Sequence, residues 1–600
     1  MPSTRLYRRL LLFSPVWLVI AAGRVLRLSF ADKELHVDEV WSIWQLLGTN
    51  HTYTLDANWP PLYVVLLDVW QTLVGRHPLF LRYLSVLLFL IGASAVYQIL
   101  CRMRDQVAGI LGMLAYSALP IGIFLTTEVR GYALAYSLFP VTLWLSMLYF
   151  DRPSLRRAAL VGIAMAALCY TTYSAAGALL VLGLYWLIVY HRKFRHWWAP
   201  AIIAGGIILP LLLLIRDNAL GRVQGLMEHT TLPPIFSSIA DIYQAYAGEQ
   251  AVFWLVIVVV AGAFLLWKRS RDRQMWALLG WVLFPVILYA TEPVLGLFRP
   301  TYSWFVLLGG ALVVGWGLSY LPRIGQILAA SGLVLAMFQP VPYDNYQAQG
   351  APLGRSLEWL AVHAQWGDVV YIDPNWQDGY CSFEGCINAE VWEYLIDVFF
   401  PHGLPIVDDP AGYRRVWYLK ADGWQDSQAE QRVVEGRVPG QFVGPWHTLL
   451  RLYEAPPDPV GIPYANGMRF HGMDVLDQTP RPLVRREGDT MRLRLWWSVD
   501  RPVEVDYSVS VQVVRGESVI AQVDGAPVPI DGGSSQTSAW EPGRFYIEER
   551  VLSLPEFAFA DVYTLYLAVY QWWDGMRIDA PGTNDAMLLP LHKLTIKSWN

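Results

Sequence analysis

Charged residues are scarce in this chain, and those present do not gather into one long basic tract. Only 16% of the 600 residues are charged, and the formal net charge is -5. A protein that binds nucleic acid needs a positively charged surface for the phosphates, so no nucleic-acid partner is expected. Disorder is excluded as well, because 54% of the residues are hydrophobic and 14% are aromatic.

Cysteine and cofactor motifs are also rare. The four cysteines are too few for a disulfide framework. Cys381 and Cys386 lie in the polar half of the chain and could close a small loop only if that half meets an oxidising compartment. The sequence has no G-x-x-x-x-G-K phosphate loop and no His-x-x-x-His or clustered His, Asp and Glu set. We therefore expect no cofactor, with a divalent metal left open.

Long apolar runs dominate the first 340 residues. A membrane-spanning helix needs roughly 20 apolar residues to cross a bilayer core of about 30 Å. Eleven runs qualify as candidates, and they start near Leu10, His77, Val107, Tyr132, Ala158, Ser174, Ala199, Ala251, Met275, Ser303 and Ile324. The sequence thus predicts a polytopic α-helical membrane protein with about eleven transmembrane helices, for which the lipid bilayer is the first partner.

Small basic clusters alternate with these runs and indicate how the chain is oriented. They comprise residues 5–9, 102–104, 152–157, 192–195, 268–273 and Arg323. Positively charged loops stay on the cytoplasmic side, which predicts a cytoplasmic amino terminus. An odd number of spans then places the carboxy-terminal region outside the cell. The segments 29–76 and 217–250 become long outward loops.

The composition changes near residue 343, where charges, prolines and short alternating patterns replace the apolar runs. Residues 1–340 are predicted to form the transmembrane domain, and residues 341–455 a small extracytoplasmic α/β domain of short strands and amphipathic helices. A proline-rich link, EAPPDP, follows at 454–459. Residues 460–600 alternate with a period of two, as in VEVDYSVSVQVV, which predicts an antiparallel β-sandwich.

Five tryptophans of this last region allow two interpretations. They are Trp496, Trp497, Trp540, Trp572 and Trp573. Their rings would fill the core of the sandwich, since each contributes a large apolar area. The second interpretation is a flat platform on which sugar rings stack. The sequence favours the core and leaves the platform open.

The first outward loop holds an acidic pair in an apolar setting. Asp38 and Glu39 are enclosed by Val37, Val40 and Trp41 in the segment LHVDEVWS. Burial among apolar side chains raises the pKa of a carboxylate and makes it a better general base. The plainer alternative is a solvated pair of loop carboxylates without a catalytic part.

Isolated arginines occur at two further outward positions. Glu128, Arg130 and Tyr132 stand at the start of the fourth predicted span, and Arg299 precedes the tenth. Such charges can be salt bridges or interfacial anchors. They can also bind a phosphate near the membrane surface, for which the planar guanidinium is well suited. Together with the acidic pair, they imply a site that holds an anion beside a base.

These motifs resemble the membrane-embedded GT-C glycosyltransferases, specifically the family 39 group with the protein O-mannosyltransferases and the bacterial aminoarabinose transferase of lipid A. The resemblance runs from about residue 25 to residue 150 and weakens beyond it. Its residues are Asp38 and Glu39; Pro60, Pro61, Leu62 and Tyr63; Arg82 and Ser85; and Glu128, Arg130 and Tyr132. Many relatives have a histidine before the Pro-Pro pair, where this chain has Trp59, so a ligand role for that histidine is absent.

The resemblance implies a sugar donor carried on a polyprenyl phosphate, in a bacterial plasma membrane. Asp38 would deprotonate the acceptor hydroxyl, which attacks the anomeric carbon with inversion, while Glu39 would orient the site or the acceptor. Arg130 and Arg299 would bind the lipid phosphate. Other residues of the substrate site would be Trp59, Pro60, Pro61, Tyr63, Arg82, Glu128 and Tyr132. The acceptor, outside the cytoplasm, would be a glycan, a protein or a lipid.

Two other classes of protein stay open at the level of sequence. A transporter or flippase of lipid-linked glycans would share the spans and the phosphate site, although transporters concentrate ionisable residues near the bilayer midplane. A non-catalytic, membrane-anchored carbohydrate-binding protein would account for the β-rich region. That interpretation leaves Asp38, Glu39 and Arg130 without a role.

Overall fold

The computed structural model describes most of the chain, in twelve stretches. They are residues 14–25, 39, 42, 60–228, 239–290, 303–339, 353–373, 396, 403–421, 428–443, 448–476 and 483–597. The chain divides into two compact units, each of which is described by itself. Unit 1 comprises residues 1–357 and 381–401, and unit 2 comprises residues 358–380 and 402–600.

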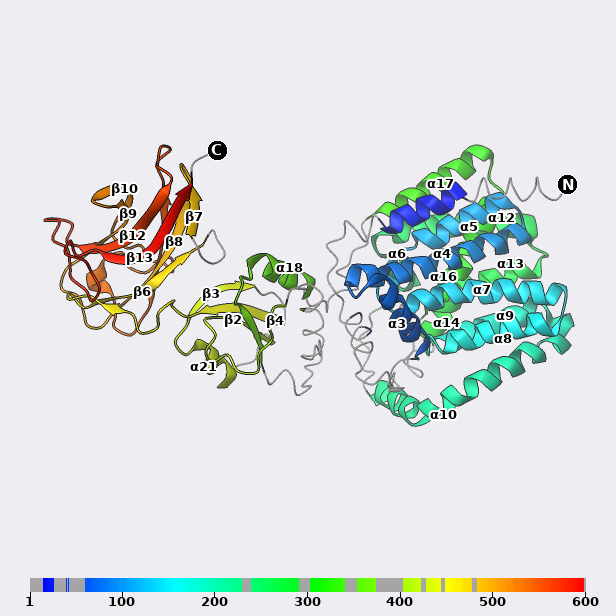
Figure 1. Ribbon diagram of the computed structural model, residues 1–600. Helices are drawn as coiled ribbons and strands as arrows, with labels where there is room; N and C mark the ends of the chain where they lie inside the picture. The colour runs from blue at the N-terminus through cyan, green and yellow to red at the C-terminus, as the bar shows by residue number, and fades with distance from the viewer. Residues whose placement is uncertain are drawn as a thin grey trace. The chain divides into compact units, whose positions relative to one another are not determined.

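Unit 1 is helical in its described part (Figure 1). The first helix is Ser14–Val25. The others are α3 (Leu62–Val74), α4 (Pro78–Met103), α5 (Gln106–Ala118), α6 (Pro120–Leu125), α7 (Tyr132–Asp151), α8 (Leu155–Cys169), α9 (Ala175–Val189), α10 (Trp198–Glu228), α11 (Ile239–Ala247), α12 (Ala251–Arg269), α13 (Arg273–Val282), α14 (Phe284–Ala290), α16 (Val306–Leu318) and α17 (Arg323–Phe338).

Of the predicted span starts, Leu10 lies outside the described residues, and the other ten fall within a helix or within three residues before one. By length and apolar composition, three helices of the described part could cross a membrane: Pro78–Met103, Tyr132–Asp151 and Gly248–Arg269. A fourth crossing results if α13 and α14, bent by 45°, form one broken span. Most of the other candidates are shorter apolar helices. Integral membrane character therefore agrees with the helices, while the count of about eleven crossings and their orientation stay predictions.

The outward loops contain helices that the sequence analysis treated as loop. Helix α3 occupies Leu62–Val74, although residues 29–76 were expected to form a loop. In the segment 217–250, α10 continues to Glu228 and α11 follows at Ile239–Ala247. Helix α3 has charged or polar residues on one side, including Asp68 and Gln71, and it is too short to meet the length of a span. Because of its short length and its polar side, α3 is not predicted by the presence of a long apolar run.

Polar caps fix where several helices begin. The side chains of Asp105, Ser154 and Asp272 accept hydrogen bonds from backbone N–H groups in the first turns of α5, α8 and α13. A capping oxygen satisfies one of the N–H groups that have no partner within the helix. Each of these caps lies in or beside a predicted cytoplasmic basic cluster. The same short loops therefore carry both the caps and the positive charge.

The basic clusters meet at one end of the helical unit. Arg102, at the end of α4, forms an ion pair with Asp151 at the end of α7. Lys193 donates to the carbonyl of Phe150. The guanidinium of Arg104 lies 4.1 Å from the ring centroid of Tyr320, three residues before Arg323 in the sequence. The alternation seen in the sequence thus places these positive loops on the same side of the unit.

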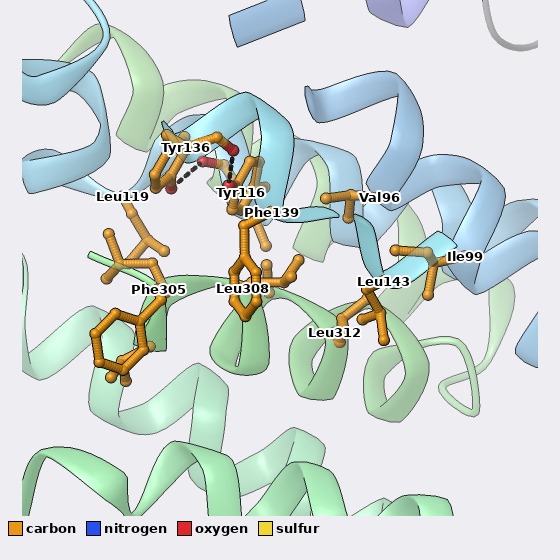
Figure 2. Close-up of a cluster of buried hydrophobic side chains, with 14 of the residues drawn as sticks. Val96, Ile99, Tyr116, Leu119, Tyr136, Phe139, Leu143, Phe305, Leu308 and Leu312 are labelled. Carbon is orange, nitrogen blue, oxygen red and sulfur yellow. Dashed lines mark hydrogen bonds between the residues drawn. The ribbon is translucent and has the colours of Figure 1, made fainter. Parts of the chain in front are cut away.

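Two tyrosines satisfy backbone groups that two prolines leave without donors (Figure 2). Pro120 and Pro140 have no N–H, so the carbonyls of Tyr116 and Tyr136, four residues earlier, cannot receive the usual helical bond. The Tyr116 hydroxyl donates to the Tyr136 carbonyl, and the Tyr136 hydroxyl donates to the Tyr116 carbonyl at 3.1 Å. The two rings stack with centroids 4.1 Å apart. An apolar core has no water for this purpose, which makes the exchange of bonds important.

Close helix contacts surround this pair. Phe139 of α7 packs against Trp304, with ring centroids 5.8 Å apart. A Cβ atom added to Gly315 of α16 would lie only 2.5 Å from the Cα of Gly112 on α5. The absence of side chains at both positions lets the two backbones touch. Helices α4, α5, α7 and α16 thus enclose the buried core, part of which Figure 2 shows.

Unit 2 contains three β-sheets and two helices in its described part. A mixed sheet in the order β1-β2-β4-β3 is followed by a five-stranded sheet, β10-β9-β12-β13-β7, and a four-stranded sheet, β11-β8-β6-β5. The helices are α18 (Leu353–His363), which begins in unit 1, and α21 (Gln428–Val434). The strands are β1 (Val369–Ile372), β2 (Arg415–Ala421), β3 (Val438–Val443), β4 (Thr448–Glu454), β5 (Ile462–Pro463), β6 (Met468–Val475), β7 (Leu483–Arg486), β8 (Thr490–Val499), β9 (Ser508–Arg515), β10 (Ser518–Gly525), β11 (Tyr546–Ser553), β12 (Asp561–Tyr570) and β13 (Leu589–Lys597).

The last two sheets share one hydrophobic core, so we call them the two-sheet domain. Alternating residues of β9 such as Val509, Val511 and Val513 enter this core, as the period of two predicts. The pairing differs from the purely antiparallel expectation at one place. Strand β13 pairs with β7 in parallel, because β7 adds to the sheet edge beside the last strand rather than by a hairpin.

The five tryptophans separate into two groups. Trp496, Trp497 and Trp540 are buried, and only Trp497 and Trp540 belong to the core between the two sheets. Trp572 and Trp573 are exposed and pack edge to face on each other. Burial therefore holds for three of the five rings, and a shared platform of all five rings does not form.

The exchange of hydrogen bonds between the two tyrosines leads to a prediction. Tyr116→Phe leaves the Tyr136 carbonyl without that donor, which should lower the unfolding free energy by about 1–3 kcal/mol. In a Pro140→Ala background the restored N–H can bond the same carbonyl, so the effect of Tyr116→Phe should shrink. Thermal unfolding of the four purified proteins in detergent measures both effects. Equal losses in the two backgrounds would contradict the assignment.

Candidate functional site

The Glu39 carboxylate ties together three segments that carry the sequence motifs. Arg82, on α4, donates to both of its oxygens, from Nε at 2.8 Å and from Nη2 at 2.6 Å. The backbone N–H of Val129 donates to the first of these oxygens at 2.9 Å. Glu39 and Arg82 are both buried. Paired, bidentate contacts of this kind fix a carboxylate in position.

A second chain of contacts lies beside the first and joins α3 to the same region. The Tyr63 hydroxyl and the Ser85 hydroxyl are 3.1 Å apart. Ser85 donates in turn to the backbone carbonyl of Glu128. Leu62, at the start of α3, donates its N–H to the carbonyl of Tyr170 at 2.9 Å. The helix that was not anticipated thus brings the Pro-Pro-Leu-Tyr motif against the other motifs.

Arg130 lines a small pocket of about 20 Å³ next to these contacts. The lining residues are Ser42, Pro60, Tyr63, Val64, Arg130, Gly131, Tyr132, Thr171 and Thr172. The guanidinium of Arg130 lies 5.6 Å from the ring centroid of Tyr132, and its side chain is largely buried. A Cβ atom on Gly131 would lie 3.0 Å from the carbonyl of Thr171, so a larger side chain would push the turn at 171–172 away. The pocket therefore combines a cation, aromatic rings and hydroxyl groups.

The structure brings together most of the residues that the sequence singled out. Pro60, Tyr63, Arg130 and Tyr132 line the pocket, and Glu39 and Arg82 form the ion pair beside it. Pro61 precedes α3 immediately, and Glu128 is buried next to Val129. Asp38, Trp59 and Arg299 lie outside the described residues, as do Cys381 and Cys386.

Thr171 and Thr172 were missed by the sequence interpretation. They interrupt the apolar run from Ala158 to Tyr190, for which the sequence predicts two spans that start near Ala158 and Ser174. The two hydroxyl residues form the turn between α8 and α9, and the Thr172 hydroxyl lies 3.0 Å from that of Ser174. A cluster of hydroxyl residues within a long apolar run is the signal that could have identified this turn as part of the site.

Arg24 is a buried charge that the sequence motifs did not predict. It lies near the end of the first helix and is only 1% exposed. Its Nη2 donates to the carbonyl of Ser117 at 2.8 Å, and its guanidinium lies 4.5 Å from the ring centroid of Phe89. These contacts anchor the first helix to α4 and α5.

The described residues contain no group of three or more His, Cys, Asp or Glu side chains that could hold a metal ion. What they offer instead is a buried cation at a pocket and a carboxylate fixed by an arginine. Such a site can bind an anionic group and position a neighbouring acidic residue.

Comparisons with known proteins concern the fold. ArnT from Cupriavidus metallidurans in the apo state is 13% identical with a TM-score of 0.47, over 73% of this chain and 98% of that chain. The Archaeoglobus fulgidus oligosaccharyltransferase with zinc and sulfate is 9% identical with a TM-score of 0.40, over 97% of this chain and 100% of the other. EmbB from Mycobacterium smegmatis is 12% identical with a TM-score of 0.37, over 90% of this chain and 63% of the other.

All three are GT-C glycosyltransferases, the group that the motifs of this sequence resemble. ArnT has also been solved with undecaprenyl phosphate bound. No family model matches the chain, and no curated protein matches it in sequence. At these identities and TM-scores the likenesses assign neither a substrate nor residue roles to this chain. Those have to be argued from the site.

The Glu39–Arg82 pair leads to a prediction. Arg82→Ala leaves a buried carboxylate without its main partner and should lower the unfolding free energy by about 3 kcal/mol or more. The matched control is Arg102→Ala, whose side chain is 39% exposed in its pair with Asp151. Removing that surface pair should cost about 1 kcal/mol or less. Unfolding in detergent, followed by tryptophan fluorescence, measures both.

The double variant Glu39→Gln with Arg82→Gln should recover part of the loss, because no buried charge is then left unpaired. If Arg82→Ala were as mild as Arg102→Ala, the pair would not hold the site together.

Proposed function

We propose that the protein is an inverting glycosyltransferase that moves a sugar from a polyprenyl-phosphate donor to a hydroxyl group of an extracytoplasmic acceptor. The observation that carries this proposal is the pocket at which the buried Arg130 lies beside Tyr63 and Tyr132, next to the fixed Glu39. A guanidinium at this place can bind a phosphate, and apolar spans around it can hold a lipid tail.

Glu39 acts in this proposal as a positioning residue. Both of its oxygens accept hydrogen bonds from Arg82, and one also accepts from Val129. Asp38 directly precedes Glu39 in the chain, and consecutive Cα atoms are about 3.8 Å apart. We assign the general base to Asp38, the acidic neighbour of this fixed carboxylate in the sequence.

The reaction breaks one bond to the anomeric carbon and forms another. Asp38 takes the proton of the acceptor hydroxyl, whose oxygen attacks the anomeric carbon. The bond from that carbon to the phosphate oxygen breaks, and the polyprenyl phosphate leaves with the electron pair. Arg130 stabilises the negative charge that collects on this leaving group, together with Arg299. Attack opposite to the leaving phosphate inverts the configuration.

Pro60, Tyr63 and Tyr132 would contact the donor in this scheme, since they form the pocket wall around Arg130. Thr171 and Thr172 line the same pocket, and their hydroxyl oxygens can accept hydrogen bonds from the sugar. Trp59 precedes this wall in sequence and is proposed to contact the donor as well.

The first test is the replacement of Asp38. A general base contributes about 100-fold to 10000-fold to a rate, so Asp38→Asn should reduce turnover by that order. Purified protein in lipid nanodiscs is incubated with a panel of polyprenyl-phosphate sugars, and the released polyprenyl phosphate is quantified. Asp68→Asn, on α3 and outside the pocket lining, is the matched control and should keep full turnover. Retained turnover in Asp38→Asn would remove it from the role of base.

The second test concerns the phosphate. Arg130→Ala should raise the apparent KM for the lipid donor by about tenfold or more, because a charged hydrogen bond is lost. The apparent KM of Arg130→Lys should lie between those of the unchanged protein and Arg130→Ala, since lysine keeps the charge without the planar fork of donors. The control is Arg76→Ala, which changes an exposed arginine next to α3. An unchanged donor dependence in Arg130→Ala would make Arg130 a structural anchor.

A further inference from the structure

A large cleft lies within unit 2. Its volume is about 1140 Å³, and its walls come from strands β2, β3 and β4 of the mixed sheet and from β8 and β11 of the two-sheet domain. Binding sites for small molecules commonly measure about 300–1000 Å³. The cleft is thus large enough for a ligand of several linked rings.

Charged side chains form the polar part of its lining. The cations are Arg415, Arg492, Arg494 and Arg544. The carboxylates are Glu454, Asp531 and Glu549. Arg494 donates to Glu454 at 2.9 Å and to Glu549 at 2.8 Å, and Arg492 donates to Glu549 at 3.0 Å. Arg494 thereby joins a carboxylate from the mixed sheet to one from the two-sheet domain, which fixes both walls of the cleft.

The charges of the cleft balance. Behind the lining, Asp368 accepts a hydrogen bond from Arg415 at 2.6 Å. The lining holds four arginines and three carboxylates, and Asp368 behind it offsets the remaining positive charge. An anionic ligand is attracted by an excess of positive potential, which the lining together with Asp368 does not provide. A neutral ligand with many hydrogen-bonding groups fits it better.

Two carboxylates of the lining, Glu549 and Asp531, remain ionised acceptors at neutral pH. Burial alone would raise the pKa of Glu549, but hydrogen bonds from Arg494 and Arg492 hold it below its usual range. Burial likewise opposes ionisation of Asp531, yet the hydrogen bond from Arg544 lowers the pKa of this group. Fixed acceptors next to fixed donors match hydroxyl groups, each of which both donates and accepts.

Apolar side chains complete the lining between the charges. Phe545 and Ile547 border the cleft on the side of the two-sheet domain, and Leu452 borders it on the side of the mixed sheet. An aromatic ring presents a flat apolar face. Carbohydrate rings have such a C–H face and a rim of hydroxyl groups, so they match both parts of the lining.

We propose that this cleft binds a neutral oligosaccharide. The site is separate from the transfer chemistry proposed for unit 1, and it does not depend on that chemistry. Its binding energy comes from hydroxyl groups that bridge the arginine–carboxylate pairs and from a ring face that covers Phe545.

A peptide strand is a poorer occupant, because both nearby sheet edges are blocked. Strand β3 is the edge of the mixed sheet, and it contains Pro439 and an irregular register between Pro439 and Phe442. Proline has no N–H to offer an added strand. Strand β11 is the edge on the other side, where Ile530 already donates to the carbonyl of Ile547 at 2.8 Å. Addition of a further strand would have to displace these features.

The test is a titration of the full-length protein in detergent micelles. The neutral probes are maltohexaose, cellohexaose, mannohexaose and xylohexaose, and the comparison probes are trigalacturonic acid and a hexapeptide of valine and threonine. Isothermal calorimetry measures the affinity. At least one neutral hexasaccharide should bind with a Kd of about 1 mM or lower.

The variants locate the binding. Arg492→Ala combined with Arg544→Ala removes two exposed donors of the cleft and should weaken binding by about tenfold or more. Phe545→Ala, a second variant, should weaken it as well. The matched control is Arg515→Ala, because Arg515 pairs with Asp561 and lies outside the lining. The side chain of Arg515 is 49% exposed, similar to the 57% of Arg492 and the 50% of Arg544. This control should bind like the unchanged protein.

Several results would overturn the proposal. They are the absence of binding by every neutral probe up to about 10 mM, equal affinities in the double variant and Arg515→Ala, or binding of the peptide or the acidic trisaccharide in place of the neutral probes. The titration is repeated on Asp38→Asn, where binding should be unchanged. A failure of the cleft is thereby distinguished from a failure of the proposed transfer reaction.

Discussion

The buried carboxylate of Glu39 is the contact on which the site of unit 1 depends. It accepts hydrogen bonds from Arg82, which is 43 residues away in the sequence, and from Val129, which is 90 residues away. Three segments with little local reason to meet are thereby held at one point. A buried ion pair contributes little net stability relative to a well-packed apolar pair, but its geometry is demanding. That demand places Arg130 beside the Pro-Pro-Leu-Tyr element of α3.

Pro120 and Pro140 in the core also bear on the position of Arg130. Pro140 interrupts the hydrogen bonding of α7, the helix whose first residue is Tyr132. The stacked Tyr116 and Tyr136 compensate for the missing bond and connect this helix to α5 (Figure 2). The start of α7, and with it the turn that carries Arg130, is therefore supported by a rigid pair of rings. Local backbone chemistry and the placement of the site are linked in this way.

The sequence predicted the positions of most helices because long apolar runs have few alternatives. The motif residues Tyr63 and Arg130 line one pocket, and Arg82 pairs with Glu39. Helix α3 was not predicted, since it is shorter than a membrane span. The turn at Thr171 and Thr172 was not predicted as part of the site, because it lies within a long apolar run. The tie between Glu39 and the Val129 N–H involves a backbone group, which no side-chain pattern reports. The cleft of unit 2 arises where two sheets meet, and that meeting is a property of tertiary packing alone.

The link at 454–459 looks like a natural place to divide unit 2, yet its surroundings argue otherwise. Arg414 binds Asp474 across the link, and Ala455 donates its N–H to the carbonyl of Arg414. Glu454 is buried and relies on Arg494, which lies beyond the link. A fragment that begins at residue 460 would lose these partners and expose an uncompensated face. A fragment meant for separate expression should therefore keep the strands on both sides of the link together.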